Sequence, residues 1–242
     1  MARRRKKKRK INLKVLIALI IIIGVTTGLL TAPIFNISKI SVSGIERLTE
    51  EQVISVSGIG LGKNIFRTSI GRARKKIMSQ PMVENVKILR KFPARIEISV
   101  EERKLFAYVP FGDVYYGIDK NCTVIETVTE CAEDSPKLTG LYTLEAPEGG
   151  EIKFQNDGET ELVKKIAGAL YENGMGDVIS ELNLQNTVNI MLVTKSGLIV
   201  QLADDSELDY KIKLMKNIID RDYTWGVFDV SNPAVPTYRK NM

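Results

Sequence analysis

The chain has 242 residues, which is enough for one large or two small domains beside a membrane anchor. It contains no histidine and only two cysteines, which excludes histidine-based catalysis and a disulfide-stapled scaffold. The net charge of +6 arises at the start of the chain, where residues 1–14 hold nine of the 35 Lys and Arg residues and no acid. The remaining chain is slightly acidic, so its body is not a polyanion-binding surface.

A membrane anchor is predicted directly after this basic block. Residues 15–32 are uncharged and rich in Ile, Leu and Val. As a helix they would span about 27 Å at about 1.5 Å per residue, close to the thickness of a bilayer core. We predict one transmembrane helix, with residues 1–14 in the cytoplasm and in contact with membrane lipid rather than nucleic acid. The alternative is a cleaved signal peptide, but the apolar segment is long and lacks a clear small-x-small cleavage site.

Residues 33–103 predict the order strand, helix, helix, strand, strand. Alternating apolar residues indicate strands over 37–44, from Val83 onward and over 95–102. Thr49 and Gln52 have the spacing of a capping box, which would start a short helix that ends at Gly58. Apolar residues at helical spacing predict a second helix from about residue 69 to residue 78.

From residue 104 to residue 230 the pattern changes to a mainly antiparallel β-domain with one or two helices, so the fold class is α+β. Residues 231–242 are expected to form an edge strand, near 234–238, and a tail. Residues 136–140 are predicted to form a turn, and residues 145–158 a mobile polar segment. The strands are expected at 106–109, 114–118, 122–126, 179–184, 188–193, 198–202 and 227–230, and the helices at 161–171 and 209–219.

The two cysteines, Cys122 and Cys131, leave two interpretations open. They could form a disulfide if this part of the chain is extracytoplasmic. They could equally be two separate small apolar residues.

Two motifs suggest chemistry, and each lacks a required part. The glycines from Gly58 to Gly62 precede Lys63, but their spacing is not that of a phosphate-binding loop, and Asn64 replaces the hydroxyl residue. Lys195-Ser-Gly197 resembles a strand motif of penicillin-binding enzymes, yet no serine is followed by lysine three positions later. A hairpin turn explains the triplet more simply.

Other arrangements of catalytic side chains are also weak. Glu101 and Glu102 are adjacent in a predicted strand, so their side chains point to opposite faces. A Ser/Lys dyad is harder to exclude, but no positioned base supports it. We therefore expect no catalytic, cofactor-binding or metal site and no small-molecule substrate. A membrane-tethered hydrolase or transpeptidase that acts on the cell wall is the alternative.

Several segments between Phe35 and Arg103 carry a resemblance to a known family: residues 40–44, the glycines before Asn64, and residues 81–86, 90–93 and 98–101. Together they resemble the membrane-proximal POTRA domain of the bacterial division proteins called DivIB in Gram-positive and FtsQ in Gram-negative bacteria. The basic tail, the single anchor and the β-rich remainder extend the resemblance over nearly the whole chain. One departure is Cys122, which alters the Asp-x-x-Gly turn often found there. Residues 136–140 match another recurrent family turn.

This resemblance implies a non-enzymatic, bitopic scaffold of the divisome, enriched at the septum, that links early and late septum-assembly proteins. It also implies partners of the DivIC/FtsB and FtsL type, bound by β-strand addition at the end of the β-domain. For each candidate contact residue the alternative is that it only closes that domain. By order along the chain, the candidates are Lys211, Lys213, Val230, Ser231, Val235, Thr237 and Tyr238.

Overall fold

The computed structural model describes residues 13–133, 135–156 and 158–240. The chain divides into two compact units. The described residues up to Ile77 and Asn85–Glu101 form the smaller unit, and Met78–Glu84 and the residues from Glu102 onward form the larger one.

Helix α1 (Leu13–Leu30) starts the described chain, and a 3-10 turn, η1 (Pro33–Phe35), follows it. Apolar side chains along α1 are exposed, with Ile20 at 60% and Ile22 at 61%. None of the helices formed by the described residues combines the length and the apolarity needed to cross a membrane. The anchor predicted over 15–32 is therefore not confirmed, and residues 1–12 of the predicted basic tail lie outside the described residues.

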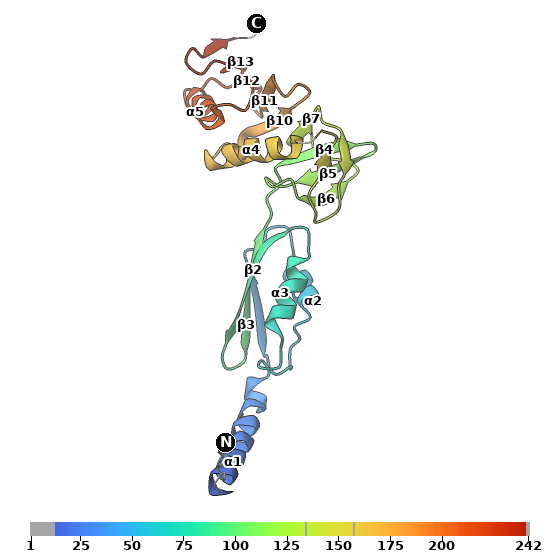
Figure 1. The fold of residues 1–242 in the computed structure, drawn as a ribbon, viewed down its shortest axis with the longest axis vertical. Coiled ribbons are helices and arrows are strands. Elements are labelled where there is room, and N and C mark those ends of the chain that lie inside the picture. Colours follow the sequence, from blue (N-terminus) through green and yellow to red (C-terminus); the bar gives the residue numbers. More distant parts are fainter. Residues whose placement is uncertain (1–12, 134, 157, 241–242) are drawn as a thin grey trace, which may run out of the picture. The chain divides into compact units, whose positions relative to one another are not determined.

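The rest of the smaller unit has the predicted order of elements. The three-stranded sheet has the order β1-β3-β2, with β1 parallel to β3. Figure 1 shows both helices on the same side of this sheet. The elements are β1 (Lys39–Ser43), α2 (Glu50–Ser57), α3 (Ile70–Met78), β2 (Val83–Lys91) and β3 (Arg95–Glu102).

Local sequence explains the bounds of these elements. The predicted capping box is present, because Gln52 N–H donates to the Thr49 hydroxyl and Thr49 N–H donates to the Gln52 side chain. Gly58 ends α2 in the left-handed conformation. Gly44, which closes β1, also needs to be glycine, because a Cβ there would lie 2.1 Å from the Val100 carbonyl oxygen.

The larger unit is built on a nine-stranded sheet with the order β14-β13-β12-β11-β10-β7-β4-β5-β6. Five of its strand pairs are antiparallel and three are parallel. The strands are β4 (Ala107–Phe111), β5 (Val114–Ile118), β6 (Val124–Val128), β7 (Lys137–Thr139), β10 (Ile179–Asn183), β11 (Ile190–Thr194), β12 (Leu198–Ala203), β13 (Gly226–Asp229) and β14 (Thr237–Arg239).

Two helices, α4 (Glu159–Glu172) and α5 (Leu208–Ile219), contribute to the core of this unit. Their buried side chains, such as Ile166 and Ile212, join those of the central strands in one apolar cluster. The short 3-10 turn η2 (Gly176–Val178) leads from α4 into β10. The burial of one side of each helix drives this packing, because apolar side chains leave water there.

Two segments of the larger unit differ from the sequence prediction. The expected turn at 136–140 contains β7, which pairs in parallel with both β10 and β4. Leu138 is buried there, but a strand of three residues is too short to show an alternating pattern. The expected mobile segment contains the antiparallel pair β8 (Thr143–Glu145) and β9 (Lys153–Phe154), which the buried Ile152 and Phe154 anchor.

The turn at Asp119 forms although Cys122 stands where the family often has glycine. The Asp119 carboxylate accepts hydrogen bonds from the N–H groups of Asn121 and Thr123 and pairs with Arg103 at 2.7 Å. Cys122 adopts the left-handed φ of +59° that glycine would take without strain. Both Cys122 and Cys131 are free thiols, so the structure has no disulfide between them.

Candidate functional site

The nine-stranded sheet has two edges, β6 and β14, and they differ in how they are covered. At β6, Val124 N–H donates to the Gly150 carbonyl at 2.8 Å, and Gly149 N–H donates to the Val124 carbonyl at 2.9 Å. In the described chain, β14 has β13 on one side and no strand on the other. An edge strand offers unpaired N–H and C=O groups to a further strand. We call β14 and the preceding turn, 230–236, the C-terminal edge.

Strand β14 is held to β13 by register and by aromatic contacts. Tyr238 pairs with Phe228, and its hydroxyl donates a hydrogen bond to the Trp225 carbonyl at 2.7 Å. Its ring meets that of Tyr223 edge to face, with centroids 4.7 Å apart. The Lys240 ammonium lies 4.9 Å from the centroid of the Trp225 ring. These side-chain contacts hold β14 in place, because a strand of three residues forms few main-chain hydrogen bonds to β13.

Gly226 allows β14 to approach β13 closely. Its φ is +113°, and a Cβ there would lie 2.6 Å from the Arg239 carbonyl oxygen and 3.2 Å from the Tyr238 ring. Any other residue would therefore strain the backbone and push β14 away. The position of the C-terminal edge depends on this glycine.

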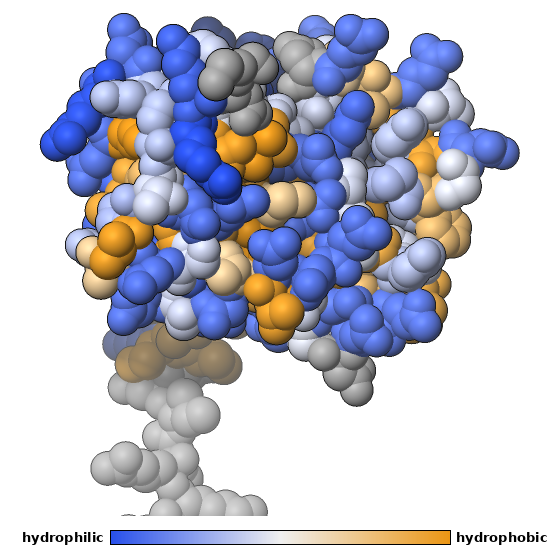
Figure 2. Space-filling model, turned by 90° about the horizontal axis from the view of Figure 1, so that it is seen from above, coloured by the Kyte–Doolittle hydropathy of each residue, from blue (hydrophilic) through white to orange (hydrophobic). Residues whose placement is uncertain are grey.

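Two hollows lie between α5 and the C-terminal edge. The first has a volume of about 330 Å³, and apolar and aromatic residues from both sides dominate its lining, including Leu214, Phe228, Pro236 and Tyr238. The second, of about 460 Å³, is more polar and lies between Tyr210 on α5 and the turn residues 231–234. Figure 2, which views the end that carries the C-terminus in Figure 1, shows apolar side chains in separate patches among mostly polar ones.

Lys211 is a candidate partner contact from the sequence, but its side chain is not on the surface. It is 0% exposed, and its ammonium donates to the Leu202 carbonyl at 2.7 Å and pairs with Asp204 at 3.0 Å. The reason is its place on the helix: it lies between Leu208 and Met215 on the buried side of α5. Lys211 therefore joins α5 to the end of β12.

The other sequence candidates fall into two groups. Val230 is 0% exposed, and its N–H donates to the Gln201 carbonyl, so it closes the core and presents no side chain to a partner. The structure brings the remaining ones to the surface near α5 and β14: Lys213, Ser231, Val235 and Thr237 are exposed and Tyr238 is half-buried. Of these, Lys213 forms an ion pair with Asp209 on its own helix.

The structure adds two aromatic residues that the sequence candidates lacked. Tyr223 and Trp225 precede β13 and are 43% and 45% exposed while they contact β14. Exposed aromatic side chains are typical of protein interfaces. The sequence signal that could have identified them is the pattern Tyr223-Thr-Trp225, two aromatic residues in a loop beside the last strands.

Acidic groups near the site are held in their charged form. The Ser231 hydroxyl and N–H donate to the Asp229 carboxylate, and with the nearby Arg239 they lower its pKa. Hydrogen bonds from Asn173 and Lys213 lower the pKa of Asp209. The surface around the C-terminal edge therefore carries fixed negative charges beside Lys213 and Arg239.

The motifs that suggested chemistry have structural roles here. Lys195-Ser-Gly197 is the hairpin turn between β11 and β12, as predicted: Gly197 has a φ of +96°, and its N–H donates to the Thr194 carbonyl. The glycine run begins at the C-terminal end of α2, not after a strand. No group of three or more metal-ligating side chains occurs in the described residues.

Comparison with known proteins places residues 35–103 in the family described as "POTRA domain, FtsQ-type". The cell division protein DivIB of Clostridium botulinum is 30% identical over 242 residues, which cover 96% of this chain and 93% of the relative. DivIB of Bacillus subtilis is 32% identical over 69% of this chain and 63% of its own length. FtsQ of Corynebacterium glutamicum is 32% identical over 93% and 95%.

Among solved structures, the major extracytoplasmic domain of DivIB from Geobacillus stearothermophilus matches with a TM-score of 0.32 and 17% identity. The match covers 50% of this chain and 98% of that one.

Proposed function

Because the chain belongs to the DivIB/FtsQ family of bacterial cell-division proteins, we propose that it is a non-enzymatic scaffold of the divisome. In this role it links early and late septum-assembly proteins and is enriched at the division septum. The observation that carries the proposal is the C-terminal edge, because it offers the unpaired side of a strand beside two hollows.

Attachment to the cell membrane is part of the proposal. The uncharged residues 15–32 follow nine basic residues, and the Ile and Val side chains of α1 are exposed. This charge pattern favours an N-terminus in the cytoplasm, with the two folded units outside the membrane. The N-terminal segment would then contact membrane lipid.

The proposed partners are proteins of the DivIC/FtsB and FtsL type, bound by β-strand addition to β14. An added strand gains main-chain hydrogen bonds to β14, and its alternate side chains point to opposite faces of the sheet. On the α5 face, the apolar hollow beside Phe228 and Tyr238 can take one such side chain. Val235, at 67% exposure, lies two residues before β14 in the C-terminal edge.

Localisation tests the division role itself. The full chain with a fluorescent fusion is expected at midcell during septation. An even distribution around the cell envelope would contradict a divisome role, whatever the edge binds.

A matched pair of variants tests the edge. Val235→Asp places a charge at the C-terminal edge, and Val188→Asp places the same charge on the β10–β11 loop at a similar exposure, 67% against 71%. We expect Val235→Asp to weaken co-purification of the DivIC- and FtsL-type partners and Val188→Asp to leave it unchanged. Equal binding by both variants would refute the use of this edge.

A further inference from the structure

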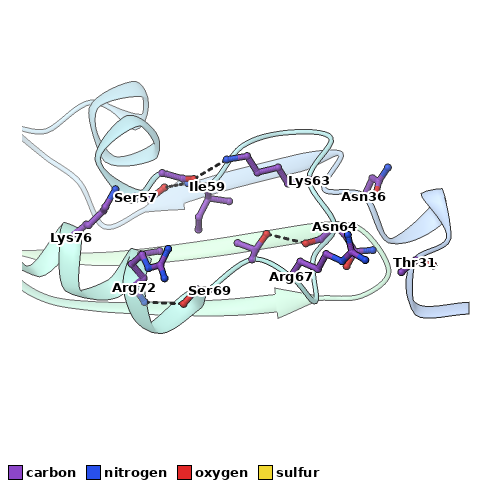
Figure 3. A pocket seen from close by; sticks show the side chains of 13 residues that line it. Thr31, Asn36, Ser57, Ile59, Lys63, Asn64, Arg67, Ser69, Arg72 and Lys76 are labelled. Atoms are coloured by element: carbon purple, nitrogen blue, oxygen red, sulfur yellow. Dashed lines mark hydrogen bonds between the residues drawn. The ribbon is translucent and has the colours of Figure 1, made fainter. Parts of the chain in front are cut away.

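The smaller unit contains a basic hollow that the proposed scaffold role does not use. Its volume is about 560 Å³, and the residues that line it include four cations and no acid. The cations come from three adjacent segments, as Figure 3 shows: Lys63 from the loop after α2, Arg67 from the loop before α3, and Arg72 and Lys76 from α3 itself.

Three of these charges are not neutralised within the described chain. Lys63, Arg67 and Arg72 form no ion pair with a described acid, and the Lys63 ammonium only approaches the Gly58 carbonyl at 3.4 Å. Ser69 also lines the hollow at the N-terminal end of α3, where the helix dipole is positive. The hollow therefore has the electrostatic character of a site for an anion.

Main-chain hydrogen bonds hold this hollow beside the end of the apolar helix α1. Ile37 N–H donates to the Lys63 carbonyl at 2.9 Å, and Gly62 N–H donates to the Ile37 carbonyl at 2.8 Å. Ile65 N–H donates to the Phe35 carbonyl at 2.9 Å. Thr31, which directly follows α1, is one of the lining residues.

Arg90 fixes the loop that carries Arg67. Its guanidinium donates to the Ile65 carbonyl at 3.0 Å and to the Thr68 carbonyl at 2.8 Å. The Phe66 ring on the same loop meets that of Phe35 edge to face and stacks on that of Phe92, with centroids 5.1 Å and 5.2 Å apart. The basic side chains thus extend from a supported loop and a helix.

We propose that this hollow binds the phosphate headgroup of an anionic phospholipid. The chemistry has two complementary halves: cations for the phosphate, and exposed Ile and Val side chains of α1 for the acyl chains. A soluble phosphate polymer would contact the cations but would have no group for the apolar side chains of α1. The inference rests on the membrane attachment in the proposed function. Gly58 and Ile59, at the start of the glycine run before Lys63, line the hollow, so this part of the run belongs to the proposed site without being a nucleotide loop.

Native mass spectrometry of the full chain in nonionic detergent tests the proposal, with phosphatidylglycerol and phosphatidylcholine as probes. We expect phosphatidylglycerol to bind in preference. The double variant Arg67→Ala with Arg72→Ala should weaken its binding about 25-fold, because each charge near the lipid contributes about fivefold. Arg67→Lys with Arg72→Lys keeps the charge and should keep most of the binding.

The matched control removes two charges from the outer side of the same helix. Arg74 and Lys75 are exposed and do not line the hollow, so Arg74→Ala with Lys75→Ala should bind phosphatidylglycerol as the parent does. An equal loss in both pairs would overturn the site, because only total charge would then matter. Binding of soluble poly(glycerol phosphate) without binding of phosphatidylglycerol would overturn the lipid assignment.

Failure of this inference is distinguishable from failure of the proposed function. A chain that fractionates with membranes but shows no lipid preference loses only the headgroup site. A chain that is recovered from cells in the soluble fraction contradicts the membrane attachment, and with it this inference.

Discussion

The Lys211 ammonium donates a hydrogen bond to the Leu202 carbonyl, 2.7 Å away, and so joins the inner side of α5 to the end of β12. The same ammonium reaches the carbonyl and the carboxylate of Asp204. Ala203 and Glu207, which flank this turn, both have positive φ values. One buried cation thus stabilises the connection that places α5 against the C-terminal edge.

Lys211→Ala is expected to destabilise the larger unit by about 3 kcal/mol, because it leaves a cavity and a buried carbonyl without its donor. Lys211→Met should cost less, since it keeps the packed stem. The exposed Lys213→Ala serves as the control and should change stability little, as exposed ion pairs contribute little. Urea unfolding followed by circular dichroism measures all three. Equal stability of Lys211→Ala and Lys213→Ala would contradict the buried role.

Asp204 makes this connection sensitive to acid. Hydrogen bonds from Ser206 and Lys211 lower its pKa from the ordinary value of 3.8. A lowered pKa in the folded state stabilises the fold above pH 3.8, and this contribution disappears as the pH falls below 3.8. Asp204→Asn should therefore lose less stability than the parent between about pH 5 and pH 2 in urea unfolding. Parallel curves for the two proteins would show that Asp204 does not contribute.

The burial of Lys211 is a feature of this site that the sequence did not predict. The helix was predictable from the spacing of Ile212 and Met215, and the same spacing places Lys211 on the buried side. Because a lysine is rarely buried without partners, the prediction placed Lys211 on the surface although the helical spacing places it on the buried side. Its partners are two carbonyls and the Asp204 carboxylate in the β12–α5 connection, and no local sequence pattern predicts these contacts.

Prediction succeeded best where elements are local and strongly patterned. Ile96, Ile98 and Val100 alternate in sequence and are all buried in β3. In contrast, β7 pairs with β10, which lies about forty residues further along the chain. Three residues carry no period, so only the long-range partner shows that they form a strand.

The two cysteines are expected to differ in reactivity. Burial raises the pKa of the Cys122 thiol to about 12, so it stays protonated near neutral pH. Cys131 is partly exposed. Iodoacetamide at about pH 8 should label Cys131 alone in the native protein, and both thiols in urea, as peptide mapping by mass spectrometry would show. A chain in which urea releases no reactive thiol would contain the disulfide instead.

A substitution at Gly226 is expected to displace the C-terminal edge while the core of the larger unit stays folded. Gly226→Ala places a Cβ against the Arg239 carbonyl oxygen at a φ of +113°, which should cost about 1–3 kcal/mol and loosen β14. Hydrogen exchange should then accelerate at Thr237–Arg239 while β11 and β12 stay protected. We expect partner co-purification to fall together with the protection of β14.

Gly112→Ala provides the matched control for that experiment. Gly112 also has a positive φ, +58°, but a Cβ there meets nothing within 4 Å, and it lies in the β4–β5 turn. This variant introduces backbone strain without moving β14, so it should bind partners as the parent does. If Gly226→Ala releases β14 and partner binding persists, the partner does not add a strand to this edge, and the contact must lie on another surface of the unit.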